Sequence, residues 1–317
     1  MESFVMANNS SEIKYEWNGS TTSLVIFTVL TLLMNGYILL LFAIKRTLHT
    51  PFAVYLISLL CANIFQTFAD LLNLLTYTRQ RWYFTSFLCS VAIYSEWVGG
   101  AAVLHSHLTI TLNRIWASTF PIHYRNYHSI RTAVLFCLLM LGYCHLLTGP
   151  LLLIDYLYYR PGMANATECT IAMDAQPQYA GFVDVWVYVV PMLVMLLSYP
   201  YLLWKRKQLG KVTESPAVTN GGVPNGKATA DSSHGFRVLT ALTGSIVICW
   251  APEKIYWMLL AFWGVDVTVL KEAANLMYSV QTVLDPLLFA VALKDLKVVI
   301  IAQWRTAFLL CYGRRPR

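Results

Sequence analysis

Charged residues are scarce in this chain. Asp, Glu, Lys and Arg make up 12% of its 317 residues, whereas hydrophobic residues make up 57%. A typical soluble domain has about 25% charged residues, so a soluble protein of this size could not cover its surface with so few charges. We therefore expect lipid to surround much of the chain. The same composition excludes intrinsic disorder, a coiled coil and collagen.

The motifs of metal sites and hydrolases are also missing. The seven cysteines form no CxxC motif and no Cys/His cluster, so we expect no metal site. Apolar stretches contain His105, His107 and His145 without an HExxH or GxSxG motif, which predicts packing or hydrogen-bonding roles, no enzyme activity and no cofactor. Residues 1–20 lack the basic and apolar regions of a signal peptide, so we expect the first apolar segment to direct the chain to the membrane.

Seven apolar stretches are long enough to cross a bilayer as helices, which takes about 20 residues. They cover residues 22–44, 52–76, 86–114, 132–157, 181–204, 236–263 and 270–293. Backbone groups in lipid must be hydrogen-bonded within the segment, and the alternation typical of a membrane β-barrel is absent from the sequence. The predicted fold is an all-α membrane protein, a bundle of seven transmembrane helices over residues 22–293.

The remaining segments are expected to lie outside the bilayer core. Residues 1–21 predict an extracellular tail, and residues 205–235 a flexible cytoplasmic loop rich in Gly, Pro, Asn, Ser and Thr. Residues 294–317 form the cytoplasmic tail and begin with an amphipathic eighth helix on the inner membrane surface. Cys311 is a candidate for palmitoylation, and an ordinary free thiol is an equal alternative.

Lysines and arginines are distributed unevenly between the two sides of the predicted bundle. The amino tail and the even-numbered connections carry five, and the other side carries seventeen. Because positive charge accumulates on the cytoplasmic side, we place the amino terminus outside the cell and the protein in the plasma membrane. The basic residues lie in short loops, so nucleic acid is not an expected partner. N-glycosylation sequons occur only on the segments assigned outside: Asn8, Asn9, Asn18 and Asn165.

Six short motifs occur in order along these spans and loops. They are Asn35; Cys89 with Asn113-Arg114-Ile115; Pro121 with Tyr124; Pro191 with Tyr199; Cys249-Trp250-Ala251-Pro252; and Asp285-Pro286-Leu287-Leu288-Phe289. With these residues the chain resembles the rhodopsin-like (class A) G protein-coupled receptors over nearly its whole length. The resemblance implies a receptor that transduces an extracellular ligand, an amine-like molecule or a peptide, to a heterotrimeric G protein through helix movement. The alternative is a seven-helix transporter or channel, although no repeats are visible.

The resemblance also implies a switch for G-protein coupling. Arg114 matches the arginine of the family's DRY motif, and Asn113 stands where the family has an acid, so we expect a weakened restraint on Arg114. Prolines within spans kink the helices. The other residues of the implied switch are Pro121, Tyr199, Trp250, Pro252, Asp285, Pro286 and Phe289.

Two further features follow from the resemblance. A disulfide is implied between Cys89 and Cys169, and the oxidising exterior favours it. The aspartate of the family's second span corresponds to Asn63, while the seventh span carries Asp285. We therefore do not expect sodium binding, and interpret Asp285 as either hydrogen-bonded to Asn63 or protonated.

Glu96 is the main ligand-binding candidate, because a carboxylate within a membrane bundle is costly. Three alternatives are open: contact with a ligand cation, an ion pair with Lys254, or a structural hydrogen bond. The residues expected to line the ligand site with Glu96 are Trp250, Glu253, Lys254, Trp257, Asn275 and Tyr278.

Overall fold

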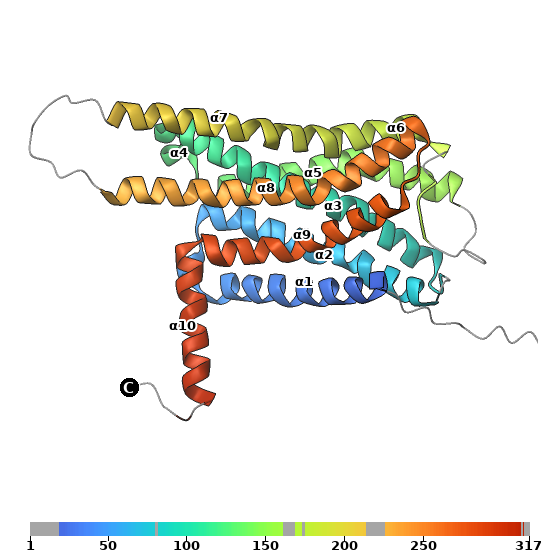
Figure 1. Cartoon of the computed structure of the whole chain (residues 1–317), viewed down its shortest axis with the longest axis horizontal. Helices are drawn as coiled ribbons and strands as arrows, with labels where there is room; N and C mark the ends of the chain where they lie inside the picture. Colours follow the sequence, from blue (N-terminus) through green and yellow to red (C-terminus); the bar gives the residue numbers. More distant parts are fainter. Residues whose placement is uncertain are drawn as a thin grey trace, which may run out of the picture.

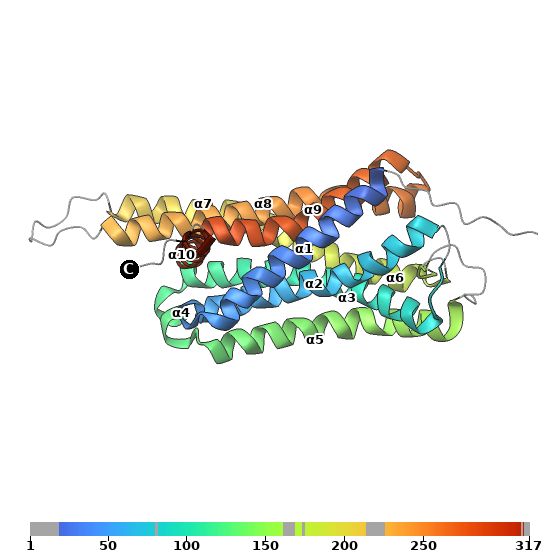
Figure 2. The same cartoon turned by 90° about the horizontal axis from the view of Figure 1, so that it is seen from below.

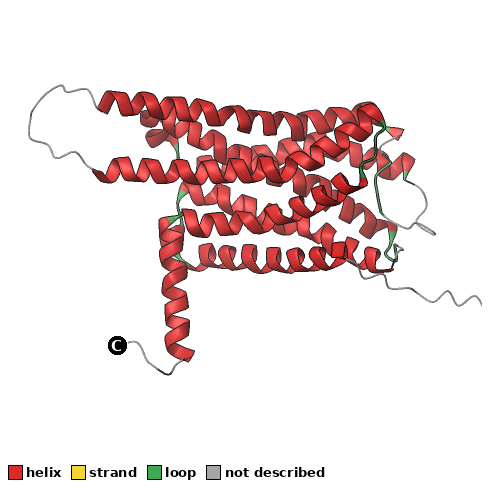
Figure 3. Cartoon of the chain, viewed as in Figure 1, coloured by secondary structure: helices red, strands yellow, loops and turns green. Residues whose placement is uncertain are grey.

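The computed structural model describes residues 19–79, 82–160, 169–172, 175–213, 226–311 and 313. Over these ranges the chain is helical, without any strand (Figure 3). The four predicted glycosylation sites, Asn8, Asn9, Asn18 and Asn165, lie outside the described residues.

The described helices follow the predicted spans. They are α1 (Gly19–Ile44), α2 (Pro51–Arg79), α3 (Ser86–Thr119), α4 (Pro121–Tyr127), α5 (Ile130–Ile154), α6 (Pro177–Val183), α7 (Val190–Thr213), α8 (Gly226–Trp263), α9 (Thr268–Ala292) and α10 (Lys294–Cys311). A 3-10 turn, η1 (Arg46–Leu48), joins α1 to α2. Two π-helical segments extend spans: η2 (Asp155–Tyr159) follows α5, and η5 (Asp184–Val189) joins α6 to α7. The predicted all-α bundle of seven spans is therefore confirmed.

The long helices lie side by side along one axis in both views (Figures 1 and 2). In Figure 1, α10 turns away from the bundle at the end where α9 finishes, and α4 lies at the same end. The connections from α2 to α3 and from α8 to α9 lie at the opposite end. We call these the α10 end and the disulfide end, since Cys89 and Cys169 are joined at the latter.

The outer faces of the bundle are apolar. Five of the spans are apolar and long enough to cross a membrane: α1, α2, α3, α5 with η2, and α6 with η5 and α7. In α8 and α9, several polar residues, such as Lys254, Gln281 and Asp285, are buried against other helices. Large apolar side chains such as Leu33, Leu146 and Leu197 are exposed. Because lipid is the solvent that accepts such a surface, the chain is a multi-pass membrane protein.

The predicted loop of residues 205–235 is shorter in the structure. Helix α7 continues to Thr213, and α8 already begins at Gly226. Extending a helix that packing has nucleated fixes one residue for each hydrogen bond gained, so both spans continue beyond their apolar parts. Helix therefore covers both ends of the expected loop, and its flexibility and cytoplasmic position stay predictions.

Helix α10 has the predicted two-sided character. Leu296 near its start is buried, whereas Trp304 is 67% exposed. Cys311 is the last residue of the helix and is an exposed free thiol. Contact with the inner membrane surface and palmitoylation stay predictions.

Candidate functional site

The disulfide end is closed by a covalent and an ionic link. Cys89 and Cys169 form the predicted disulfide, with their Cα atoms 5.7 Å apart. Cys89 is fully buried near the start of α3. The bond ties residues 169–172 to α3 and confirms the expected pairing.

Sequence reasoning missed the ionic link, which joins Asp155 to Arg160. The π turn of η2 places Arg160 over Asp155, and Arg160 donates hydrogen bonds of 2.9 Å and 2.7 Å from Nε and Nη2 to Asp155 Oδ2. The backbone N–H of Ala172 donates to Oδ1 at 2.9 Å, and Arg160 Nη1 donates to Ser90 Oγ at 2.6 Å. Because the two groups lie five residues apart, the spacing of an ordinary α-helix gave no signal for this contact.

Aromatic rings converge on Trp250 in the middle of the bundle. Trp250 is 1% exposed, with its ring centroid 4.8 Å from that of Tyr278 and 6.3 Å from that of Tyr188. The Tyr188 hydroxyl donates a 2.7 Å hydrogen bond to the Trp97 carbonyl of α3. Trp257, two turns beyond Trp250, is partly buried against Tyr256. Pro252 lies inside α8 directly after this cluster.

Lys254 is buried, and its ion-pair partners are Asp184 and Glu253 rather than Glu96. Its Nζ lies 3.3 Å from Asp184 Oδ1 and 3.6 Å from Glu253 Oε1. It also lies 4.1 Å from the centroid of the Tyr188 ring, a cation–π contact. The expected alternative of a Glu96–Lys254 pair is therefore wrong, because the π turn of η5 brings Asp184 to the lysine instead.

Three acids, Asp70, Glu96 and Glu253, form what we call the acidic cluster. The charge of Glu96 interacts with those of Asp70 on α2 and Glu253 on α8. Glu96 is exposed to solvent, and Asp70 and Glu253 are half-buried. Among the described side chains, no cation lies within ion-pairing distance of Asp70 or Glu96.

Asn275 does not face the bundle as predicted. It is exposed, while Ala274, Gln281 and Asp285 form the buried face of α9. At 3.6 residues per turn Asn275 lies roughly 90° from the centre of that face. Tyr278 does face inward and contacts Trp250.

A buried polar network surrounds Asp285, which is fully buried. His107 Nε2 lies 3.2 Å from both carboxylate oxygens, and Gln281 Nε2 donates to Oδ1 at 2.7 Å. Asn63 Nδ2 donates to Asp285 Oδ2 and to Asn35 Oδ1, each at 3.1 Å. The predicted hydrogen bond between Asn63 and Asp285 is confirmed. Of the two roles expected of His107, packing or hydrogen bonding, the structure shows hydrogen bonding, and only its partner Asp285 was not predicted.

Toward the α10 end, Arg114 makes no ion pair with the described residues. Its guanidinium carbon lies 4.0 Å from the centroid of the Phe52 ring. Asn113 is buried, and its amide nitrogen lies 3.4 Å from the Tyr55 hydroxyl and 3.1 Å from His128 Nε2. The Tyr124 hydroxyl donates to Asn113 Oδ1 at 3.3 Å. Asn113 thus links α3 to α2, to α4 and to the residue that follows α4. Arg114 packs on the Phe52 ring instead.

The other expected switch residues are spread along the same half of the bundle. Phe289 and Pro286 are buried in α9, and Tyr199 is half-buried in α7. Pro121 is exposed at the first position of α4, where proline needs no hydrogen-bond donor.

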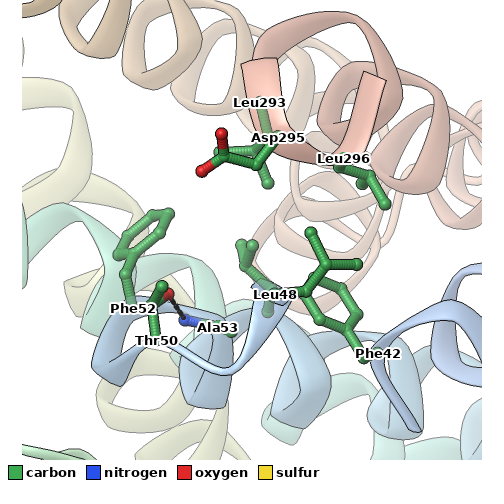
Figure 4. Close-up of a pocket in the computed structure, with 9 residues that line it drawn as sticks. Phe42, Leu48, Thr50, Phe52, Ala53, Leu293, Asp295 and Leu296 are labelled. Carbon is green, nitrogen blue, oxygen red and sulfur yellow. Dashed lines mark hydrogen bonds between the residues drawn. The ribbon is translucent and has the colours of Figure 1, made fainter. Parts of the chain in front are cut away.

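A small pocket lies beside Arg114's aromatic partner (Figure 4). Figure 4 shows the Asp295 carboxylate and the Phe52 ring at the same side of this pocket. Its lining residues are Phe42, Leu48, Thr50, Phe52, Ala53, Leu56, Leu293, Asp295 and Leu296. The pocket joins the α1–α2 turn to the junction of α9 and α10.

Comparison with known proteins identifies the family. The model of the seven-transmembrane receptors of the rhodopsin family matches residues 34–289. The chain belongs to this family. It is also similar to galanin receptor type 2 of human, mouse and rat, with 24% identity to each. These alignments cover 70% to 76% of this chain, and it spans only 58% to 59% of the length of these relatives.

The candidate residues of this receptor form two groups at different depths. The acidic cluster, Lys254 and the rings around Trp250 lie toward the disulfide end. Asp285 and its partners lie deeper, and Arg114 lies nearer the α10 end. Trp250 and Pro252, on the same turn of α8, lie between the groups.

Proposed function

We propose that this receptor binds an extracellular ligand at the disulfide end and activates a heterotrimeric G protein at the α10 end. The disulfide end would then face outward and the protein would lie in the plasma membrane. The uneven distribution of lysine and arginine supports this orientation.

The observation that carries the proposal is the position of Trp250. Its ring is fully buried between Tyr188 and Tyr278, yet its Nε1 has no hydrogen-bond partner among the described residues. An unpaired buried donor is costly, and two residues further on Pro252 removes a backbone hydrogen bond of α8. A ligand that moves either tyrosine changes the packing of Trp250 next to this weak point. The α10-end half of α8 can then swing outward.

A peptide ligand is the alternative we favour, and it is supported by the similarity to receptors that are named for the ligand galanin. The exposed Glu96 and the half-buried Trp257 offer polar and aromatic contacts that suit a peptide side chain. Membership of the rhodopsin family does not favour the transporter or channel alternative.

G-protein coupling is tested by measuring nucleotide exchange on purified heterotrimers with membranes that contain the receptor. Pools of extracellular peptides that include galanin serve as stimuli. We expect exchange above that of receptor-free membranes, and its loss in Arg114→Ala at unchanged receptor level. Lys271→Ala, which changes an exposed cation of α9 near the disulfide end, away from the proposed G-protein face, is the control and should keep the activity. Exchange that is the same with and without the receptor, for every G-protein class and pool, would contradict the proposal.

A further inference from the structure

Asp70 and Glu96 lie on facing helices, one turn beyond a close contact between α2 and α3. A Cβ atom added to Gly99 would lie 3.0 Å from the Cα atom of Gln66, so the two backbones touch there. Asp70 lies four residues after Gln66, and Glu96 four residues before Gly100. Because the two helices run in opposite directions, both steps lead one turn toward the disulfide end. The two carboxylates therefore lie above the same contact, and their charges interact.

The charges near these carboxylates do not balance. Asp70, Glu96, Glu253 and Asp184 place four carboxylates in this part of the bundle, and among the described side chains only the ammonium of Lys254 pairs with any of them. Lys254 is already bound to Asp184, Glu253 and the Tyr188 ring. Among described side chains, Asp70 and Glu96 have no cationic partner. Carboxylates inside a membrane bundle are costly unless they are paired, so a cationic group of a ligand would be stabilised beside Asp70 and Glu96.

A buried amide below the two acids also lacks a partner. Gln66 is only 2% exposed, and its Oε1 makes no hydrogen bond with the described residues. This oxygen lies 4.0 Å from the position that a Cβ atom on Gly100 would take. The Tyr278 hydroxyl and Cη2 of Trp250 lie 2.8 Å and 3.6 Å from the same position. The Tyr278 hydroxyl therefore occupies the space that the missing side chain of Gly100 leaves, next to the Trp250 ring and near the unpaired Gln66 oxygen, one turn below Glu96.

We propose that Asp70, Glu96 and Gln66 form the binding site for a guanidinium group of the ligand. The inference rests on the proposed function, because it assigns the ligand's chemistry at that receptor's site. The two carboxylates and the unpaired Oε1 of Gln66 are hydrogen-bond acceptors, and a guanidinium presents five N–H donors in a planar fork that matches carboxylates. The adjacent Trp250 and Tyr278 rings suit a delocalised cation. An arginine of a peptide and a small guanidino compound share this group.

The test measures thermal unfolding of the purified full chain with three probes. L-Arginine amide carries the guanidinium, L-citrulline amide has nearly the same shape without the charge, and L-lysine amide carries an ammonium. We expect arginine amide to raise the melting temperature in a concentration-dependent manner, lysine amide to do so less, and citrulline amide not at all. Asp70→Asn and Glu96→Gln should each weaken the apparent affinity for arginine amide about tenfold, since each removes a charged hydrogen-bond acceptor.

Glu272→Gln is the matched control, because Glu272 is an exposed acid near the same end of α9, and it should bind arginine amide as the unchanged chain does. Equal effects of arginine and citrulline amides, no effect of arginine amide up to its solubility limit, or unchanged affinity in both variants would overturn the inference. If a variant does not fold, the comparison of the two amides on the unchanged chain decides. We then compare the binding of agmatine, a small guanidino compound, with that of short arginine-containing peptides. The tighter binder identifies the source of the guanidinium group.

This binding assay contains no G protein. Loss of nucleotide exchange would therefore contradict the proposed function and leave the guanidinium site intact. Conversely, a peptide that activates the receptor with equal potency in the unchanged chain, Asp70→Asn and Glu96→Gln would overturn the site while the receptor function stands.

Discussion

The receptor has carboxylates in two very different settings. Asp285 is fully buried, and His107, Gln281 and Asn63 all contact its oxygens. Glu96 is exposed to solvent within the bundle and has like charges as its electrostatic neighbours. Both acids lie on spans, so the membrane alone does not explain why one is paired and the other is not.

We propose that this difference separates a structural acid from a ligand-binding acid. Burying a charge costs several kcal/mol unless hydrogen bonds and opposite charges compensate it. The network around Asp285 provides that compensation within the chain. Glu96 is exposed and Asp70 is half-buried, and neither has an ion pair with a described residue, so their interactions are open to a ligand.

Asp155 shows that depth in the membrane does not decide whether an acid is paired within the chain. It lies at the disulfide end, as Glu96 does, but it is fully buried and bound by Arg160 and the Ala172 backbone. We therefore expect Asp155 to behave like Asp285 in stability measurements and unlike Glu96.

Asp155→Ala should have the largest effect. The change leaves the buried guanidinium of Arg160 without its carboxylate, and such a loss costs about 3–5 kcal/mol. A strongly lowered melting temperature of the purified receptor is the expected result, together with lower surface expression. Glu272→Ala removes an exposed acid and serves as control. An equally small effect of both changes would show that Asp155 is not a structural acid.

Asp285→Ala should follow, with a loss of about 2–3 kcal/mol. It leaves the buried donors of Gln281 and Asn63 without an acceptor, and each unpaired buried group costs about 1–3 kcal/mol. Thermal unfolding without ligand measures the loss. The matched variant is Asp70→Ala, which also removes a carboxylate from a span but should not destabilise the receptor. Equal losses in the two variants would remove the distinction between paired and unpaired acids.

The pair of Lys254 and Asp184 should give an intermediate effect. Their side chains are 10% and 30% exposed, so solvent screens the pair and we expect a coupling of about 1 kcal/mol. A double-mutant cycle with Lys254→Gln and Asp184→Asn measures this coupling directly. The corresponding cycle of Lys254→Gln with Glu96→Gln should give less coupling. A larger coupling in the Lys254–Glu96 cycle than in the Lys254–Asp184 cycle would instead make Glu96 the main partner of Lys254.

The spans and the disulfide could be predicted from the sequence because each depends on local features. The length of an apolar stretch predicts a span, and the resemblance of Cys89 and Cys169 to the family's cysteine pair predicts the disulfide. The ion pairs could not be predicted in this way. Asp184 and Asp155 reach their partners through π turns, η5 and η2, which shift the face of a helix and which no residue pattern announced.

Asn275 shows the same limit on a regular helix. Counting along the chain placed it near Tyr278, but one helical position separates an exposed side chain from a buried one. Gln66 was missed for another reason. Its importance depends on the approach of Gly99 and Gly100 from α3, and a glycine pair in an apolar stretch does not indicate which helix will approach it.

Glu96→Gln should change the free energy of unfolding least among these variants, and the sign of that change is informative. The change removes one of three like charges while the side chain keeps its size, and the new amide can donate a hydrogen bond to a neighbouring acid. Repulsion between solvated charges is weak, so we expect the ligand-free receptor to gain a few tenths of a kcal/mol, on the order of a surface-charge effect. Glu96→Asp keeps the charge and should give no gain. Because salt screens exposed charges, the gain should shrink at high ionic strength. A clear loss of stability, independent of salt, would mean that Glu96 already has a partner and belongs with Asp285 among the structural acids.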